Sequence, residues 1–213
     1  MIFRTTLIIL AFSFHALAQS KNTAPSKTPT APKKVVFLGD SITAGYGIEK
    51  ESAYPSQLQK MFNQDNHQVE IVNVGISGST SASLPSRLNW LLKQPMDLLV
   101  IGLGGNDGLR GFPIETTEKN LEKAILLAQK SKIPVLLLGM QLPDNYGKAY
   151  QDGFKKMFPK LSKKHSVPLM PFLLKDVGGK PELNLNDRIH PNEKGHLIIA
   201  KNMYPLIKKV LNL

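Results

Sequence analysis

One serine and one histidine stand where they can carry out nucleophilic catalysis. Ser41 follows a short apolar run and a Gly-Asp pair, and His190 lies in a polar loop ahead of the last helical segment. A serine hydroxyl is a weak nucleophile near neutral pH and needs an adjacent general base. His190 is the only one of the five histidines that lies in such a loop. Together the two residues indicate a serine hydrolase.

Each candidate residue also has a purely structural interpretation. Ser41 can cap the helix that follows it, and Asn106 can occupy a turn that needs a left-handed backbone conformation. Asp187 can cap a turn before the last helix, which would leave His190 as a partly buried polar residue. The catalytic interpretation therefore depends on the occurrence of all these motifs in one chain.

Glycine and small polar residues gather in three segments, each directly after an apolar run. They are residues 39–43 (GDSIT), 75–80 (GISGST) and 104–107 (GGND). Open parallel sheets carry their functional residues in loops at the carboxyl ends of the strands, near the point where the strand order reverses. The three segments are therefore expected to lie at one edge of a parallel sheet.

Short apolar runs alternate along the chain with longer segments of helical spacing. The apolar runs are residues 35–38, 69–74, 98–103, 134–140 and, more weakly, 167–173. The helical segments are residues 54–62, 84–92, 114–128, 150–162 and 196–211. This alternation predicts an α/β fold, a flavodoxin-like three-layer sandwich with a five-stranded parallel sheet. In the strand order 2-1-3-4-5, the first three loops would be neighbours.

The three loops, together with residues 187–191 (DRIHP), resemble in order and spacing the motifs of the SGNH/GDSL hydrolase family. The resemblance covers nearly the whole expected domain, and one departure is Ile42, where the family has leucine. Residues 104–112 (GGNDGLRGF) and 142–147 (LPDNYG) further resemble its bacterial periplasmic acyl-CoA thioesterases, lysophospholipases and arylesterases. The serine does not lie in a G-x-S-x-G motif, which argues against an α/β-hydrolase.

The resemblance implies a role for each motif. Asp187 would accept a hydrogen bond from His190 and hold the imidazole in one orientation. The backbone N–H groups of Ser41 and Gly78 and the side-chain amide of Asn106 would form the oxyanion hole. Catalysis would proceed through an acyl-enzyme on Ser41, and it would require no metal ion or organic cofactor.

Apolar residues near the motif loops are candidates for binding an acyl chain. We expect Leu109, Phe112 and Pro143 to contact the substrate, and the resemblance implies a mobile loop at residues 109–113. Leu103, Ile114 and Leu142 are further candidates, for which packing in the core is the alternative. The expected substrates are acyl esters and thioesters, including lysophospholipids.

The N terminus predicts export. Residues 1–18 contain Arg4 as their only charge, then an apolar run at 7–12, then Ala16-Leu17-Ala18. This is the pattern of a signal peptide cleaved after Ala18, and it places the protein in the periplasm or outside the cell. Residues 19–34 are rich in Ser, Thr, Pro and Lys and predict a flexible linker, which leaves 35–213 as the hydrolase domain.

The charge and cysteine content limit the partners. The formal net charge of +11 favours a weak attraction to an anionic membrane surface. Basic and aromatic residues do not alternate as they do in single-strand binders, so no nucleic-acid partner is expected. The chain contains no cysteine, which excludes a cysteine nucleophile, thiolate metal ligands and a lipoprotein anchor. We expect a monomer.

Three other functions remain open. A carbohydrate O-deacetylase could carry the same four motifs. A non-catalytic nucleotide or phosphate binder is disfavoured because residues 102–108 lack the G-x-G-x-x-G spacing and follow the third strand. A metal-dependent hydrolase using Asp187 and His190 would need a third ligand, and the sequence contains no H-E-x-x-H motif.

Overall fold

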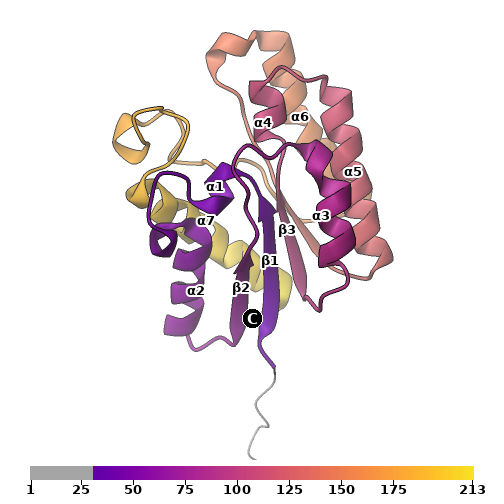
Figure 1. Cartoon of the computed structure of the whole chain (residues 1–213), viewed down its shortest axis with the longest axis vertical. Coiled ribbons are helices and arrows are strands. Elements are labelled where there is room, and N and C mark those ends of the chain that lie inside the picture. The colour runs from indigo at the N-terminus through magenta and orange to yellow at the C-terminus, as the bar shows by residue number, and fades with distance from the viewer. Residues whose placement is uncertain (1–30) are drawn as a thin grey trace, which may run out of the picture. The chain divides into compact units, whose positions relative to one another are not determined.

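A computed structural model describes residues 31–213, so the expected signal peptide and most of the expected linker lie outside the described residues. Its centre is a parallel sheet of five strands in the order β2-β1-β3-β4-β5 (Figure 1). The strands are β1 (Lys33–Gly39), β2 (Val69–Asn73), β3 (Leu98–Gly102), β4 (Val135–Leu138) and β5 (Leu169–Met170). The predicted fold class and strand order are confirmed.

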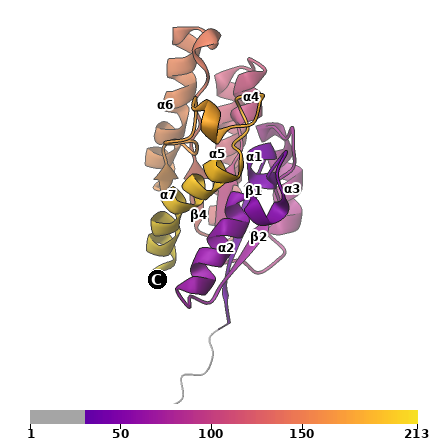
Figure 2. The same ribbon diagram turned by 90° about the vertical axis from the view of Figure 1, so that its left-hand side faces the viewer.

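Helices cover both faces of the sheet and form the three predicted layers. On one face lie α2 (Tyr54–Gln64) and α7 (Glu193–Leu211), which run side by side (Figure 2). On the other face lie α3 (Leu84–Leu91), α5 (Ile114–Lys130) and α6 (Lys148–His165). The short helices α1 (Ser41–Ala44) and α4 (Gly105–Leu109) follow β1 and β3 directly. Four 3₁₀ turns complete the described elements, at Lys50–Ser52, Ser81–Ser83, Asp144–Tyr146 and Pro181–Leu183.

The alternation of side chains along each strand builds two separate cores. Val35 and Phe37 of β1 pack with α2 and α7, whereas Val36 and Leu38 pack with α3, α5 and α6. Both neighbours of a residue point to the opposite face because side chains alternate along a strand. An uninterrupted apolar run is therefore what a strand buried on both faces requires.

Most element boundaries differ by a few residues from the sequence-based expectations, and two of the differences change an assignment. The strand β1 begins at Lys33, because Lys33 and Lys34 pair with β2 and Lys34 forms an ion pair with Glu70 at 3.4 Å. An apolar run marks only the buried part of a strand, so the end of the expected linker belongs to the sheet. Residues 105–109, expected as a loop, form α4.

None of the helices within residues 31–213 is long and apolar enough to cross a membrane.

The loops after β1 and β2 lie against each other. The backbone N–H groups of Val74 and Ile76 donate to the carbonyls of Phe37 and Gly39 at 2.9 and 3.1 Å, which extends the parallel ladder beyond the strands. A Cβ atom on Gly75 would lie 2.4 Å from the backbone nitrogen of Ala44. Glycine is thus required where the second loop passes the helix that follows β1.

The close approach of Gly75 leads to a testable prediction about stability. Gly75→Ala should lower the free energy of unfolding by about 1–3 kcal/mol, because the clash is with backbone and no side-chain rotation relieves it. Gly102→Ala is the matched control, since its Cβ would lie 3.2 Å from the end of the flexible Leu138 side chain. Urea denaturation measures both, and equal losses would contradict the prediction.

Candidate active site

Ser41 is the first residue of α1 and projects from the carboxyl end of β1. The helix is capped by Asp40, whose side-chain Oδ1 accepts a hydrogen bond from the Ile42 N–H at 3.0 Å. Gly45 ends the helix in the left-handed conformation, with φ of 79°. Since Asp40 serves as the cap, the structural interpretation of Ser41 as a cap does not apply.

A chain of buried polar contacts holds α1 against α2 and α7. The Thr43 hydroxyl lies 2.9 Å from the hydroxyl of Tyr54, which is fully buried. The Tyr54 N–H donates to Nδ1 of His196 at 3.1 Å. Burial lowers the pKa of His196 to about 4, so its ring stays neutral and accepts this bond at neutral pH. These contacts join α1 to α2 and α7.

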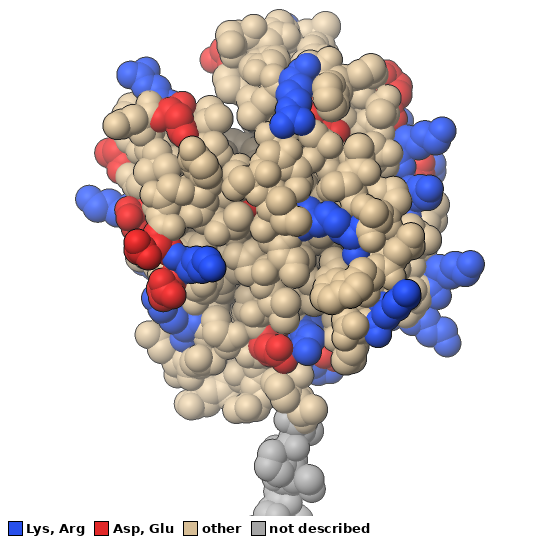
Figure 3. All heavy atoms as spheres, viewed as in Figure 1, with Lys and Arg blue, Asp and Glu red and all other residues tan. Residues whose placement is uncertain are grey.

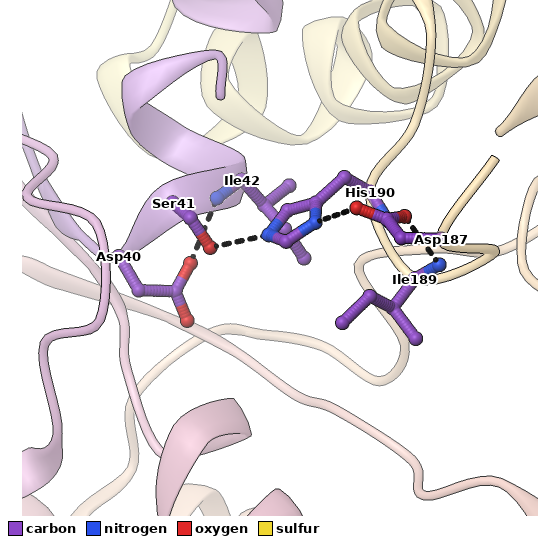
Figure 4. Close-up of polar contacts among 6 residues, drawn as sticks. All are labelled: Asp40, Ser41, Ile42, Asp187, Ile189 and His190. Carbon is purple, nitrogen blue, oxygen red and sulfur yellow. Dashed lines mark hydrogen bonds and ion pairs between the residues drawn. The ribbon is translucent and has the colours of Figure 1, made fainter. Parts of the chain in front are cut away.

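The structure brings Ser41, His190 and Asp187 together, although Ser41 and His190 are 149 residues apart. His190 Nε2 lies 2.8 Å from the Ser41 Oγ, and its Nδ1 lies 2.7 Å from Asp187 Oδ2 (Figure 4). With the ring proton on Nδ1 donated to Asp187, Nε2 is free to accept the serine proton. The arrangement is that of a nucleophile, a general base and an orienting carboxylate.

Hydrogen bonds between its backbone and the Asp187 side chain hold the loop that carries His190. The N–H groups of Ile189 and His190 both donate to Asp187 Oδ1 at 3.0 Å. Arg188 adopts the left-handed conformation with φ of 63°, which turns the chain between Asp187 and His190. Asn192 then caps α7 by accepting from the N–H groups of the following helical turn.

Asp187 is ionised in this setting. Its partial burial opposes ionisation, but the hydrogen bonds from the backbone and side chain of His190 outweigh that effect and lower its pKa. The negative charge can therefore stabilise an imidazolium ring on His190.

Tyr46 contacts the imidazole ring of His190 and was not singled out from the sequence. The two ring centroids are 4.6 Å apart and the planes are inclined by 40°. Tyr46 is half exposed and lies just after α1, where its position along the chain gives no sign of the contact.

Asn106 lies in the first turn of α4 and faces the same site. Its Nδ2 donates to the Ser79 carbonyl at 3.0 Å, which leaves a second amide proton available. Gly78 has φ of 76° and is exposed on the neighbouring loop. The backbone N–H groups of Ser41 and Gly78 donate to no acceptor within the described chain. Three expected oxyanion donors are thus unpaired or half-paired.

The helix α4 clamps the loop that carries Gly78. Asp107, which is buried, accepts from the Ser81 N–H at 2.9 Å, the Ser81 hydroxyl at 2.5 Å and the Thr117 hydroxyl at 3.3 Å. Arg110 donates to the Gly78 carbonyl at 3.2 Å. The sequence of the GGND motif alone indicates no role for its aspartate. A buried carboxylate with donors from two further segments is visible only in the folded chain.

A cavity of about 450 Å³ opens beside Ser41 and His190. Asn106, Leu109 and Pro143 line it as well, whereas Gly78 is not among the lining residues. The apolar part of the wall consists of Ile42, Leu109, Met140, Leu142, Pro143, Phe172, Leu174 and Ile189. A concave, mainly apolar site with a few polar groups at one end suits an acyl chain whose carbonyl lies at Ser41.

Three of the apolar candidates lie elsewhere. Phe112 does not line this cavity in the described structure, and the Tyr150 hydroxyl donates to the Phe112 carbonyl at 2.6 Å. Leu103 is buried in the core under α3, α5 and α6, and Ile114 packs against that core. The apolar character of Leu103 and Ile114 reflects packing in the interior, whereas Phe112 is partly exposed and its contact with the substrate stays a prediction.

Within residues 31–213, no three His, Cys, Asp or Glu side chains are grouped so that they could hold a metal ion.

Known proteins resemble this chain in sequence and in structure. The profile of the GDSL-like Lipase/Acylhydrolase family matches residues 37–198. An arylesterase of Vibrio mimicus is 40% identical over 177 residues, which cover 83% of this chain and 88% of that protein. The thioesterase 1/protease 1/lysophospholipase L1 of Escherichia coli K12 is 38% identical over 182 residues, which cover 83% and 86% of the two chains. A crystal structure of the psychrotrophic esterase EstA from Pseudoalteromonas, inhibited by monoethylphosphonate, has a TM-score of 0.81 at 35% identity and covers 85% of this chain and 100% of that one.

The buried carboxyl of Asp40 leads to a prediction about pH. Burial raises its pKa to about 6, partly offset by the hydrogen bond from the Ile42 N–H. Because the folded state binds this proton more tightly than the unfolded state, the associated stability is complete below about pH 4 and is lost as the pH rises through 6. Asp40→Asn, which keeps a capping oxygen, should therefore be more stable than wild type at pH 7.5 by up to about 3 kcal/mol. Chemical denaturation at pH 4 and 7.5 tests this, and a difference that does not change with pH would contradict it.

The clamp of α4 leads to a prediction about turnover. Asp107→Asn replaces an acceptor with a donor opposite Ser81, so the Gly78 loop should shift and kcat should fall by up to about 10²-fold with little change in KM. Thr117→Val is the matched control, because Thr117 is equally buried and bonds the same carboxylate but lies outside the loop. It should cost about 1 kcal/mol of stability and leave kcat near wild type. Equal effects of the two variants on kcat would show that Asp107 acts through stability alone.

Proposed function

We propose, from the premise that this chain belongs to the GDSL-like lipase/acylhydrolase family and is a carboxylic ester hydrolase, that Ser41 is its nucleophile, His190 its general base and Asp187 the residue that orients His190. The observation that carries this proposal is the continuous hydrogen-bonded chain from Ser41 Oγ through the imidazole to Asp187. In the first half-reaction Ser41 attacks the acyl carbonyl while His190 takes the hydroxyl proton. His190 then gives that proton to the leaving alcohol or thiol.

The second half-reaction uses the same residues. Water attacks the acyl group on Ser41 while His190 accepts a proton from it. His190 then returns this proton to Ser41 Oγ as the acyl–oxygen bond breaks, and the free acid leaves. In both steps the carbonyl oxygen becomes negative. The unpaired N–H groups of Ser41 and Gly78 and the second amide proton of Asn106 support their role as oxyanion donors.

The enzyme acts on small-molecule esters, and the apolar cavity supports acyl chains as the part of the substrate that it binds. Leu109 and Pro143 line this cavity, which supports them as substrate contacts. We extend the proposal to thioesters and lysophospholipids, since one relative is named thioesterase 1/protease 1/lysophospholipase L1. A carbohydrate O-deacetylase would need a polar surface around the acetyl group, and the apolar wall disfavours it.

The location and assembly are also part of the proposal. The signal-like pattern of residues 1–18 supports export to the periplasm or the medium. The net charge of +11 supports a weak attraction to anionic membranes, and we expect a monomer.

The test is hydrolysis of p-nitrophenyl butyrate and octanoate by wild type and by Ser41→Ala. Loss of the nucleophile should lower kcat by on the order of 10⁴-fold or more. Ser77→Ala is the control, because Ser77 is an exposed serine on the neighbouring loop, and it should retain activity. A folded Ser41→Ala variant with wild-type turnover would refute the assignment.

A further inference from the structure

An exposed apolar groove lies on the loop after β2 and the end of α3. Val74, Gly75, Ile76, Arg87, Trp90 and Leu91 line it, and we call it the Trp90 groove. Trp90 is 62% exposed and Ile76 is 55% exposed. Among the large hydrophobic side chains of residues 31–213, these two are the most exposed. Single exposed apolar residues are common, but a tryptophan and an isoleucine that share one groove form an apolar patch, and such patches mark interaction sites.

The groove is a built feature of the fold. The Arg87 guanidinium donates to the Gly39 carbonyl at 3.1 Å and to the Ser79 hydroxyl at 3.3 Å, and it also bonds the Val74 carbonyl. Arg87 thus joins α3 to the ends of β1 and β2. Ile76 lies two residues before Gly78, so the groove borders the loop that carries a proposed oxyanion donor.

The segment that forms the groove carries no acidic side chain. Residues 71–96 contain no Asp or Glu, and their charged side chains are Arg87 and Lys93. Lys93 follows α3 directly, where its N–H donates to the Trp90 carbonyl at 3.2 Å. Figure 3 shows the face that includes α3, and at its right edge the charged side chains are mostly lysine and arginine. The surroundings therefore attract an anionic surface.

The combination of features favours a lipid surface as the occupant. Tryptophan prefers the interface between water and lipid, where its apolar ring and its polar N–H are both accommodated. Lysines beside it gain free energy from anionic headgroups. A second copy of this chain would bring two basic faces together, and a nucleic-acid strand would need more than one stacking aromatic ring.

We propose that the Trp90 groove docks the protein onto anionic lipid membranes, with Trp90 and Ile76 inserted at the level of the headgroups and Lys93 against their phosphates. The functional reason for this docking rests on the proposed action on acyl lipids, because docking beside the Gly78 loop would bring lipid esters close to Ser41. Its geometry is independent of the catalytic assignment.

Trp90 is the only tryptophan of the chain, so its fluorescence reports on this groove alone. The full chain is titrated with vesicles of phosphatidylglycerol and phosphatidylcholine, and separately with vesicles of phosphatidylcholine alone. We expect the emission of Trp90 to shift to shorter wavelength with the anionic vesicles only, and the shift to be reversed by salt. Hydrolysis of p-nitrophenyl butyrate is measured in parallel.

Two variants and one control localise the contact. Lys93→Gln should weaken partition into the anionic vesicles about fivefold, and Ile76→Ser should weaken it about tenfold. Leu197→Ser removes a partly exposed apolar side chain from α7, on the opposite face of the sheet, and should bind as wild type does. All three should hydrolyse the water-soluble ester at the wild-type rate, so a failure of docking is distinguished from a failure of the proposed catalysis.

Three outcomes would overturn the proposal. The first is an unchanged Trp90 emission with anionic vesicles, and the second is an equal shift with neutral vesicles. The third is a shift that depends on protein concentration without lipid, which would identify a second copy of the chain as the occupant.

Discussion

The burial of β1 on both faces is the constraint on which the active site depends. The strand pairs with β2 on one edge and β3 on the other, and its residues Val35 to Leu38 are almost completely buried. A strand held on two edges and two faces cannot shift without disrupting both cores. Ser41 begins the helix just beyond its end, so the packing of the core fixes the position of this proposed nucleophile.

The other proposed catalytic groups reach Ser41 from separate layers. His190 and Asp187 come from the loop before α7, which packs with α2 on one face. Asn106 comes from α4, after β3, and bonds the loop after β2. Parallel strands place all these loops at the same edge of the sheet, which is why Ser41, Asn106 and His190 line one cavity.

Polar contacts fix the positions of the loops and of α1 at the carboxyl edge of the sheet. Asp107 and Arg110 hold the loop of Gly78 from one side, and Arg87 of α3 holds it through the Ser79 hydroxyl. The His196 and Tyr54 contacts do the same for α1. Among the described residues, no buried side-chain nitrogen or oxygen lacks a hydrogen-bond partner. A fully paired network of this kind keeps the proposed oxyanion donors and nucleophile in place without the free-energy cost of buried unpaired groups.

The sequence alone determined the strands and the principal helices, because apolar periodicity is a local property of the chain. The order of its motifs also predicted the Ser41, Asp187 and His190 set, which the folded chain brings together. The tertiary structure decided what depends on contacts between distant segments. Asp107 holds the Gly78 loop because Ser81 and Thr117 donate hydrogen bonds to it in the folded chain. Tyr46 contacts His190, although the two residues are 144 positions apart in the sequence. Phe112 and Leu109 look alike in sequence, yet only Leu109 faces the cavity. Direction of a side chain in a loop is set by the packing and hydrogen bonds around it, and no local pattern records those partners.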